Sequence, residues 1–336
     1  MPMCWARFGP GKTISDEPCH LSQGMGHFVP GPFRMNEESR LLSSVRIWMM
    51  AVRPKTLWAS VAPVIVGLAL AQAEGPLNWL AAIATLVGSI LIQIGTNFSN
   101  DYSDFHKGAD TEEREGPVRV TQAGLVSPGR MLGSTVFVFA LAGLVSIYLV
   151  SAAGWPIAVI GVAAIASGVL YTAGPFPLGY LGLGDLFVCI FFGPVAVGGT
   201  YFVQCGTAPW PVLVAGLAPG LLSVAILVVN NLRDIEGDRA AGKKTLAVRF
   251  GPLFARVEYL FCILASAAVP LVLIAMPGWD YPVAFASVAL ILGAVPPIRG
   301  VFKQADGKAL NPVLAATAKL LLIYSLVFSV MWVLSS

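Results

Sequence analysis

The stretch PVLVAGLAPGLLSVAILVVNNL occupies residues 211–232 and contains no charged side chain. A helix of this length would be about 30 Å long, which matches the hydrocarbon thickness of a bilayer. The stretch also lacks a polar face, so it does not fit a helix at the surface of a water-soluble domain. We therefore predict that it spans a membrane.

Apolar runs near the length of a spanning helix recur along the chain. Together they predict nine spans, at residues 57–73, 80–100, 131–151, 155–171, 185–204, 211–232, 253–275, 282–298 and 312–334. The composition agrees, because 56% of the residues are hydrophobic and only 12% are charged. Soluble proteins carry about 25% charged residues. The sequence therefore predicts an all-α polytopic membrane protein with nine transmembrane helices.

Lysine and arginine are concentrated on one side of the predicted spans. The connections at 72–79, 152–155, 205–210 and 276–281 contain neither residue, whereas the alternate connections carry nearly all of them. Cytoplasmic connections are enriched in Lys and Arg. The pattern predicts a multi-pass protein of the cell's inner (cytoplasmic) membrane with a cytoplasmic N-terminus. The net charge of +3 does not indicate nucleic-acid binding, because the charges are confined to a few connections.

Residues 1–45 differ from the rest of the chain. They are rich in Gly, Pro and Ser, and they lack the apolar core of a secretory signal peptide. We expect a disordered N-terminal tail over 1–45 and one transmembrane domain over 46–336. The five cysteines show no CxxC spacing, so they predict neither a disulfide framework nor a zinc site.

Polar side chains recur at helical spacing where the second predicted span ends. Gln93, Asn97 and Asp101 lie four residues apart, so a continued helix places them on one face. Asn100 and Asp104 share the adjacent face. Polar residues inside a membrane helix are costly, and by default they indicate function.

The sixth predicted span ends in a second segment of the same kind, in which Asn230, Asp234 and Asp238 lie four residues apart. Like charges at this spacing repel each other, and a divalent cation would remove that repulsion. Mg²⁺ takes oxygen ligands and usually bridges carboxylates to substrate phosphates. Two such segments with Lys and Arg alongside predict a diphosphate site. We interpret the nearby glutamates as solvated surface: Glu112, Glu113, Glu115 and Glu236.

The two segments resemble the Asp-rich motifs of the UbiA superfamily of intramembrane prenyltransferases, whose members form a nine-helix bundle. The second segment fits the family pattern closely. The first fits as Asn100-x-x-x-Asp104, but Gly108 occupies the third acidic position and Asp110 follows two residues later. The chain is most similar to the branch that prenylates 1,4-dihydroxy-2-naphthoate. The stretches that carry this similarity are 53–57, 100–102, 107–110, 171–175, 231–236 and 244–251.

The resemblance implies transfer of a polyprenyl group from a polyprenyl diphosphate to 1,4-dihydroxy-2-naphthoate, with loss of diphosphate and CO₂. The product would be demethylmenaquinol, an intermediate of menaquinone biosynthesis. Mg²⁺ would be held by Asp104, Asp110, Asp234 and Asp238. Tyr171 could stabilise an allylic cation through its ring face. The candidate substrate-binding residues are Asn97, Asn100, Asp101, Arg119, Asn230, Asn231, Arg239, Lys243, Lys244, Arg53, Lys55 and Asp185.

Several of these assignments have a simpler competing interpretation. The basic residues can serve membrane topology alone, and Tyr171 can belong to an interfacial aromatic belt. Asp185 can cap the helix that it opens. Two other functions also stay open. One is prenylation of another aromatic acceptor such as 4-hydroxybenzoate, and the other is secondary transport. Transporter sites lie near the membrane midplane, whereas these carboxylates lie at the ends of spans.

Overall fold

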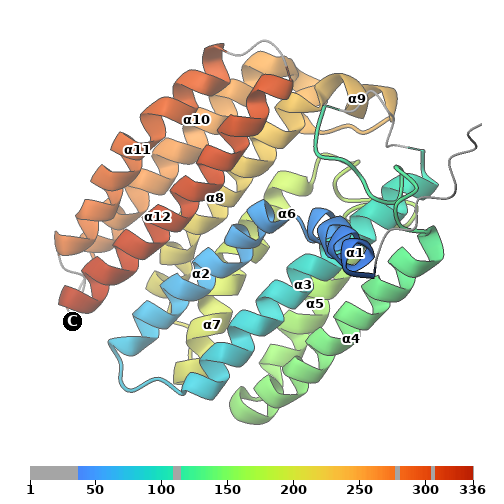
Figure 1. Cartoon of the computed structure of the whole chain (residues 1–336). Helices are drawn as coiled ribbons and strands as arrows, with labels where there is room; N and C mark the ends of the chain where they lie inside the picture. Colours follow the sequence, from blue (N-terminus) through green and yellow to red (C-terminus); the bar gives the residue numbers. More distant parts are fainter. Residues whose placement is uncertain (1–36, 109–114, 277–280, 304–306, 336) are drawn as a thin grey trace, which may run out of the picture. The chain divides into compact units, whose positions relative to one another are not determined.

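The computed structural model describes residues 37–108, 115–276, 281–303 and 307–335, and these residues form helices and no strand. The all-α prediction is therefore confirmed for this part of the chain. The elements labelled in Figure 1 and the short η turns between them are α1 (Glu37–Val52), α2 (Pro54–Gln72), α3 (Trp79–His106), α4 (Pro128–Ala153), α5 (Pro156–Leu170), α6 (Gly184–Ile190), η1 (Phe191–Val195), α7 (Ala196–Cys205), α8 (Trp210–Arg233), α9 (Ile235–Ala240), α10 (Leu246–Ile274), η2 (Tyr281–Val283), α11 (Ala284–Lys303), η3 (Lys308–Leu310) and α12 (Asn311–Ser335).

Eight helical segments of the described residues are long and apolar enough to cross a membrane, with α6, η1 and α7 counted as one. They coincide with eight of the nine predicted spans. The remaining predicted span, at 155–171, corresponds to α5. This helix has 15 residues, fewer than the roughly 20 that a spanning helix needs.

The chain divides into two units, Met1–Leu41 and Leu42–Ser336. Residues 1–36 of the predicted tail lie outside the described residues, and from Glu37 onward the chain forms α1. The helix stops at Arg53, which adopts a left-handed conformation with φ 54°. The following Pro54 explains the stop, because proline disfavours the helical conformation of the residue before it. The Asn97 side-chain amide, on α3, donates to the Val52 carbonyl at 2.8 Å and so holds the end of α1 in place.

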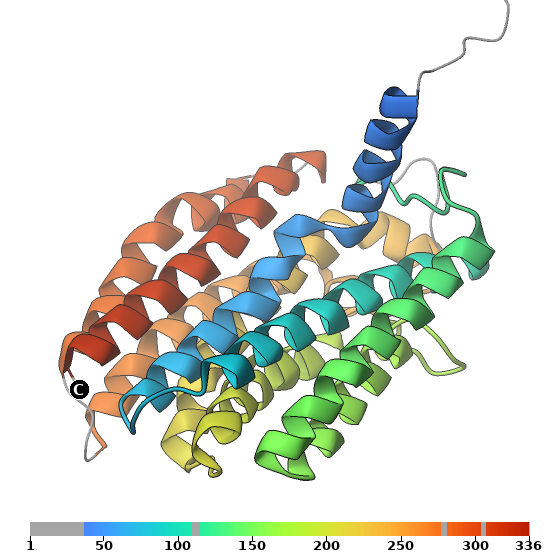
Figure 2. The same ribbon diagram turned by 60° about the horizontal axis from the view of Figure 1, so that its bottom comes forward.

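Within the second unit, α8 lies at the centre of the packing. It contacts α10 and α12 on one side and α2, α6 and α7 on the other, and its side chains belong to the largest hydrophobic core. A second group of helices consists of α3, α4 and α5, and α2 contacts both groups. Figures 1 and 2 show these helices side by side, with α3 and α8 ending on the same side. Those two helices carry the predicted polar segments.

The span formed by α6, η1 and α7 is bent at Gly193, whose φ of −117° and ψ of −111° are not helical. At this point η1 crosses α8 at very short range. A Cβ added at Gly216 would lie 2.9 Å from the Gly193 carbonyl carbon. π-Helical turns within helices often occur near functional sites. Phe191 and Phe192, which lie just before the bend, line a cavity.

Candidate active site

Two acidic side chains from two helices face one lysine. Asp104 in the last turn of α3 and Asp238 in α9 are both buried. The Lys243 Nζ lies 3.6 Å from Asp104 Oδ2 and 3.5 Å from Asp238 Oδ1. The fold thus brings together the two segments that the sequence predicted to form one site.

The turn after α9 explains how Lys243 reaches this position. Gly242 has a φ of 72°, the left-handed conformation that commonly follows a helix end. The chain then folds back, and the Lys243 N–H donates to the Asp238 carbonyl at 2.8 Å. Lys244 meanwhile bonds through its backbone N–H to the Tyr180 carbonyl, and its side chain is exposed.

Asp104 accepts hydrogen bonds from two further side chains. Arg119 Nη2 donates to Asp104 Oδ2 at 3.0 Å, and the Tyr180 hydroxyl donates to Asp104 Oδ1 at 3.0 Å. The neighbouring Asp101 holds the segment that carries Arg119. Its carboxylate accepts the backbone N–H groups of Val120 and Thr121 at 3.3 and 3.4 Å. Asp101 therefore helps to position Arg119 through the backbone of the two residues that follow it.

The second acidic segment is held by a buried arginine. Arg233 donates to both oxygens of Asp234, at 2.8 and 2.6 Å, and to the Asn230 amide oxygen at 2.7 Å. A further bond of 3.0 Å links Arg233 to Asn311 at the start of α12. Because Arg233 connects α8 to α12 and orients Asp234, it is part of the site that the sequence motifs did not identify.

The connection between α5 and α6 supplies residues that sequence reasoning also missed. The Tyr180 ring lies 4.7 Å from Lys107 Nζ and 5.1 Å from Lys243 Nζ, which is within cation–π range. Lys107 donates to the Thr172 carbonyl at 2.6 Å, and the Thr172 hydroxyl donates to the Asn100 amide oxygen at 2.8 Å. The sequence signal was weak, because this connection contains no Lys or Arg.

Lys107 lies just beyond α3 and belongs to the same cluster of charges. Burial lowers the pKa of its ammonium below the ordinary value for lysine, and Lys243 acts in the same direction. The carboxylate of Asp104 opposes this effect and raises the pKa. The Lys107 ammonium thus interacts electrostatically with both Asp104 and Lys243.

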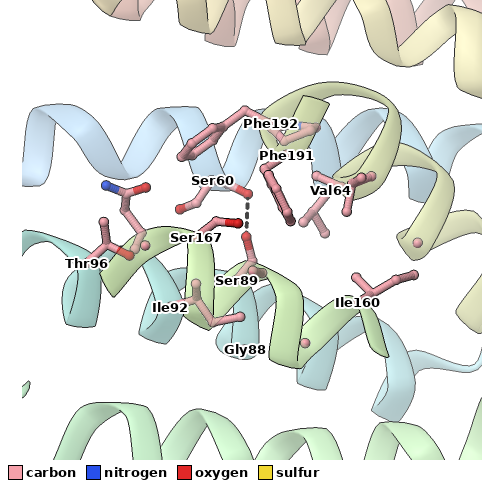
Figure 3. Close-up of a pocket in the computed structure, with 18 of the residues that line it drawn as sticks. Ser60, Val64, Gly88, Ser89, Ile92, Thr96, Ile160, Ser167, Phe191 and Phe192 are labelled. Atoms are coloured by element: carbon pink, nitrogen blue, oxygen red, sulfur yellow. Dashed lines mark hydrogen bonds between the residues drawn. The ribbon is translucent and has the colours of Figure 1, made fainter. Parts of the chain in front are cut away.

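These charged groups surround a cavity of about 210 Å³. An adjoining cavity of about 290 Å³ lies between α2, α3, α5 and η1 and is mostly apolar. Both cavities are lined by Gln93, Asn100, Tyr171, Val188 and Phe192, so Tyr171 stands at their junction. Figure 3 shows the apolar cavity, with Ser60, Val64, Gly88, Ser89, Ile92, Thr96, Ile160, Ser167, Phe191 and Phe192 around it.

Most of the residues that the sequence singled out line the charged cavity: Arg53, Asn100, Asp104, Arg119, Tyr171, Asn230, Asn231, Asp234, Asp238 and Lys243. Asn97 instead lines the apolar cavity and braces the start of α2. Lys55 and Lys244 are exposed and line neither cavity.

Two further candidates are not brought into the cavities. Arg239 is exposed and forms an ion pair of 2.8 Å with Glu236, which agrees with the interpretation of Glu236 as solvated surface. Asp185 is buried near the start of α6 but lines neither cavity. Asp110 lies outside the described residues.

The donor groups of the charged cavity suit a hard divalent cation. Carboxylates from Asp104, Asp234 and Asp238 and amides from Asn100 and Asn230 all line it. Mg²⁺ prefers such oxygen ligands. In the described residues, no three acidic, His or Cys side chains are grouped as a ready metal site. The oxygen ligands therefore fit Mg²⁺ in chemistry, and Arg119, Arg233 and Lys243 already offset part of the carboxylate charge.

The eight long apolar helices indicate an integral membrane protein, and its acidic and basic cavity adjoins a mostly apolar one. The chain belongs to the UbiA prenyltransferase family, whose model matches residues 60–333. Membership of a prenyltransferase family disfavours the transporter alternative.

Relatives and solved structures agree with this assignment. The chain is 36% identical to the 1,4-dihydroxy-2-naphthoate octaprenyltransferase of Escherichia coli over 85% of this chain and 95% of that protein. It is 37% identical to the enzyme of the same name from Mycobacterium tuberculosis, over 85% and 96% of the two chains. A UbiA homolog from Archaeoglobus fulgidus, solved bound to GPP and Mg²⁺, shares the fold with a TM-score of 0.61 at 14% identity, over 85% and 99% of the chains.

Proposed function

We propose that the protein transfers a polyprenyl group from a polyprenyl diphosphate to 1,4-dihydroxy-2-naphthoate, releasing diphosphate and CO₂ and giving demethylmenaquinol. The observation that carries the proposal is the junction of the two cavities at Asn100 and Tyr171. A prenyl diphosphate has an anionic head and an apolar tail, and the two cavities match these two parts. The carbon between head and tail, where the bond breaks, would then lie beside Tyr171.

The charged cavity supports cleavage of the carbon–oxygen bond. As the bond breaks, its electron pair leaves with the diphosphate, and Arg119, Lys243 and Arg53 stabilise the growing negative charge. A bound Mg²⁺ would add charge neutralisation of the leaving group, with Asp104, Asp234 and Asp238 as the residues that hold it. Tyr171 presents its ring near the developing allylic cation, and the apolar walls keep water from capturing it.

The acceptor is proposed from the relatives, because two of them carry the name 1,4-dihydroxy-2-naphthoate octaprenyltransferase at 36% and 37% identity. The electron-rich naphthoate ring would attack the allylic carbon of the donor. The attacking atom would be the ring carbon that bears the carboxylate. Loss of CO₂ returns the bonding electrons to the ring and restores its aromaticity. The same relatives are named octaprenyltransferases, so we propose a polyprenyl diphosphate as the donor and octaprenyl diphosphate as the first donor to test.

The distribution of Lys and Arg supports a location and an orientation. We propose that the protein resides in the cell's inner (cytoplasmic) membrane, with its N-terminus and the charged cavity facing the cytoplasm. The connections that carry Lys and Arg include those after α3 and α8, which border the charged cavity. This orientation gives the cavity access to soluble Mg²⁺ and to a water-soluble naphthoate.

The proposal is tested with purified full-length protein, octaprenyl diphosphate and Mg²⁺. The acceptor is 1,4-dihydroxy-2-naphthoate or 4-hydroxybenzoate, each labelled with ¹⁴C in its carboxyl group. We expect the naphthoate to yield a lipid-soluble product and an equal amount of labelled CO₂. EDTA should stop the reaction, and added Mg²⁺ should restore it. Prenylation of 4-hydroxybenzoate with its label kept, and no reaction of the naphthoate, would contradict the proposed acceptor. Full activity in EDTA would contradict the metal dependence.

A further inference from the structure

Each candidate metal-binding carboxylate in the charged cavity already lies beside a cationic side chain. Asp104 is bonded to Arg119, and Asp234 is bonded to Arg233. The third cation, Lys243, lies between Asp104 and Asp238, so it pairs with carboxylates from both acidic segments. In the absence of ligand, the negative charge of the site is therefore offset by the chain itself.

Lys243 is held differently from the two arginines. Both arginines donate hydrogen bonds of 2.6 to 3.0 Å to carboxylate oxygens. The ion pairs of Lys243 measure 3.5 and 3.6 Å, longer than the roughly 2.7–2.9 Å of a strong charge-assisted hydrogen bond. Its ammonium also lies over the face of the Tyr180 ring, 5.1 Å from the ring centroid. A lysine is a compact charge on a flexible stem, so this ammonium can change partners at little cost.

We propose that Lys243 is an internal cation that fills the gap between Asp104 and Asp238 and makes divalent-cation binding conditional on the diphosphate. The proposal rests on the proposed function, since it requires that a prenyl diphosphate binds in this cavity. A divalent cation that enters alone must expel the ammonium from two buried carboxylates. When the diphosphate enters with the metal, it offers Lys243 new anionic partners, and Asp104 and Asp238 then face the metal without the Lys243 ion pairs.

This arrangement predicts a reciprocal coupling between metal and diphosphate. Removing the ammonium takes away a positive charge that lies 3.6 and 3.5 Å from the two carboxylates, so the metal alone should bind more tightly. The same change removes a cation that the bound diphosphate would contact, so the diphosphate should tighten metal binding less. A lysine that only contacts phosphate would not affect the affinity for the metal in the absence of diphosphate.

The test measures Mn²⁺ binding to full-length protein in lipid nanodiscs from the electron paramagnetic resonance signal of free Mn²⁺. Lys243→Met and Lys243→Gln are compared with the wild-type protein, with and without geranyl thiolodiphosphate as an unreactive donor. Lys244→Met is the matched control, because it removes one positive charge at the next residue, outside both cavities. Circular dichroism and gel filtration establish that the variants are folded.

We expect both Lys243 variants to bind Mn²⁺ alone about tenfold more tightly than the wild type, because an interaction between charges a few ångströms apart is lost. The thiolodiphosphate should tighten Mn²⁺ binding strongly in the wild type and in Lys244→Met, and only weakly in the Lys243 variants. If the wild type shows this coupling but the Lys243 variants bind Mn²⁺ alone no better, the proposal for Lys243 is overturned while the proposed function stands. If no protein binds Mn²⁺ even with the thiolodiphosphate, both proposals are overturned.

Discussion

The Asp104 carboxylate accepts hydrogen bonds from the Arg119 guanidinium and the Tyr180 hydroxyl. The Lys243 ammonium lies nearby, and the three groups come from three different parts of the chain. The negative charge of Asp104 therefore fixes the positions of Arg119, Tyr180 and Lys243 in addition to any role toward a metal. Asp238 shares Lys243 with it across the cavity. The loss of either charge leaves a cation in the cavity without one of its carboxylate partners.

At these two positions we predict that Asp104→Asn and Asp238→Asn each lower kcat by at least about 10²-fold, the order of magnitude seen when one electrostatic contact to a transition state is removed. The amide keeps the size of the side chain and removes only the charge. Initial rates with purified protein and octaprenyl diphosphate measure the effect. Glu236→Gln is the control, because Glu236 is exposed, and its rate should stay within twofold of the wild type. Normal rates in either aspartate variant would refute its role.

Asp101 allows a separate prediction, because it acts through the backbone of residues 120 and 121. Asp101→Ala leaves two buried N–H groups without their acceptor, which costs about 1–3 kcal/mol for each group. We expect the segment that carries Arg119 to shift, so that KM for the prenyl diphosphate rises while KM for the acceptor changes little. Asp101→Asn retains an acceptor oxygen and should recover most of the affinity. A loss of kcat with unchanged KM for the donor would contradict this positioning role.

The residues show how far the sequence could predict the site. Four-residue spacing identified Asp104, Asp234 and Asp238, because that spacing is a local property of a helix. The same spacing placed Asn97 and Asp101 among the binding residues, although one braces α2 and the other holds the segment of Arg119. Tyr180 could not be found in this way, because its bond to Asp104 joins residues 76 positions apart.

At the scale of elements, the crossing of η1 and α8 determines where the walls of the apolar cavity lie. Gly193, Gly216 and Gly220 allow the two backbones to approach closely, in the way that small residues permit close packing of membrane helices. The bend at Gly193 precedes Pro194, and Phe191 and Phe192 line the cavity next to it. The packing of two helices thus shapes a cavity to which α8 itself contributes no residue.

Gly216→Ala tests this crossing. The new Cβ would lie 2.9 Å from backbone atoms of Gly193 and Pro194, so the helices must separate. We expect a destabilisation of about 1–3 kcal/mol, the usual cost of overpacking. Gly143→Ala on α4 is the matched control, because an added Cβ there has no neighbour within 4 Å. Thermal unfolding in detergent measures both, and equal midpoints for the two variants would contradict a tight crossing.

The apolar cavity provides a second matched pair on helix α5. Ala164 lines the cavity, whereas Ala166, two residues further on, is exposed. Ala164→Phe should obstruct the tail of a long donor, and we expect kcat/KM for octaprenyl diphosphate to fall about 10- to 200-fold relative to that for geranyl diphosphate. Ala166→Phe should leave the ratio unchanged. An unchanged ratio in Ala164→Phe would place the tail elsewhere.

The elements were more predictable than the site. Long apolar runs located all eight candidate spans, although α10 begins at Leu246 and not at 253, and α3 continues past 100 to His106. Hydrophobicity over about 20 residues suffices to find a span but not its polar ends. The same reasoning predicted neither α1 nor the helical bend at Gly193, because α1 is not an apolar run of that length and the bend depends on contacts with α8. The sequence also does not distinguish α5 from a full span, because the apolar run at 155–171 is longer than the 15-residue helix.

For the molecule as a whole, the described residues that line the two cavities lie between Arg53 and Leu314 in the sequence. We therefore predict that deletion of residues 1–34 leaves kcat and KM within about twofold of the full-length values, as expected for a change away from the site. The amount of membrane-inserted protein is measured in parallel, so that a change in activity is distinguished from a change in expression. A large loss of specific activity in correctly inserted protein would show that the N-terminal residues contribute to the site.

We infer that the two acidic segments form one diphosphate site that adjoins the apolar cavity. The most direct measurement is an experimental structure of the full-length protein with Mn²⁺ and farnesyl thiolodiphosphate. We expect the metal and the diphosphate among Asp104, Asp234 and Asp238, and the tail between α2, α3, α5 and η1. A diphosphate bound away from these carboxylates, or a tail outside that cavity, would contradict this inference.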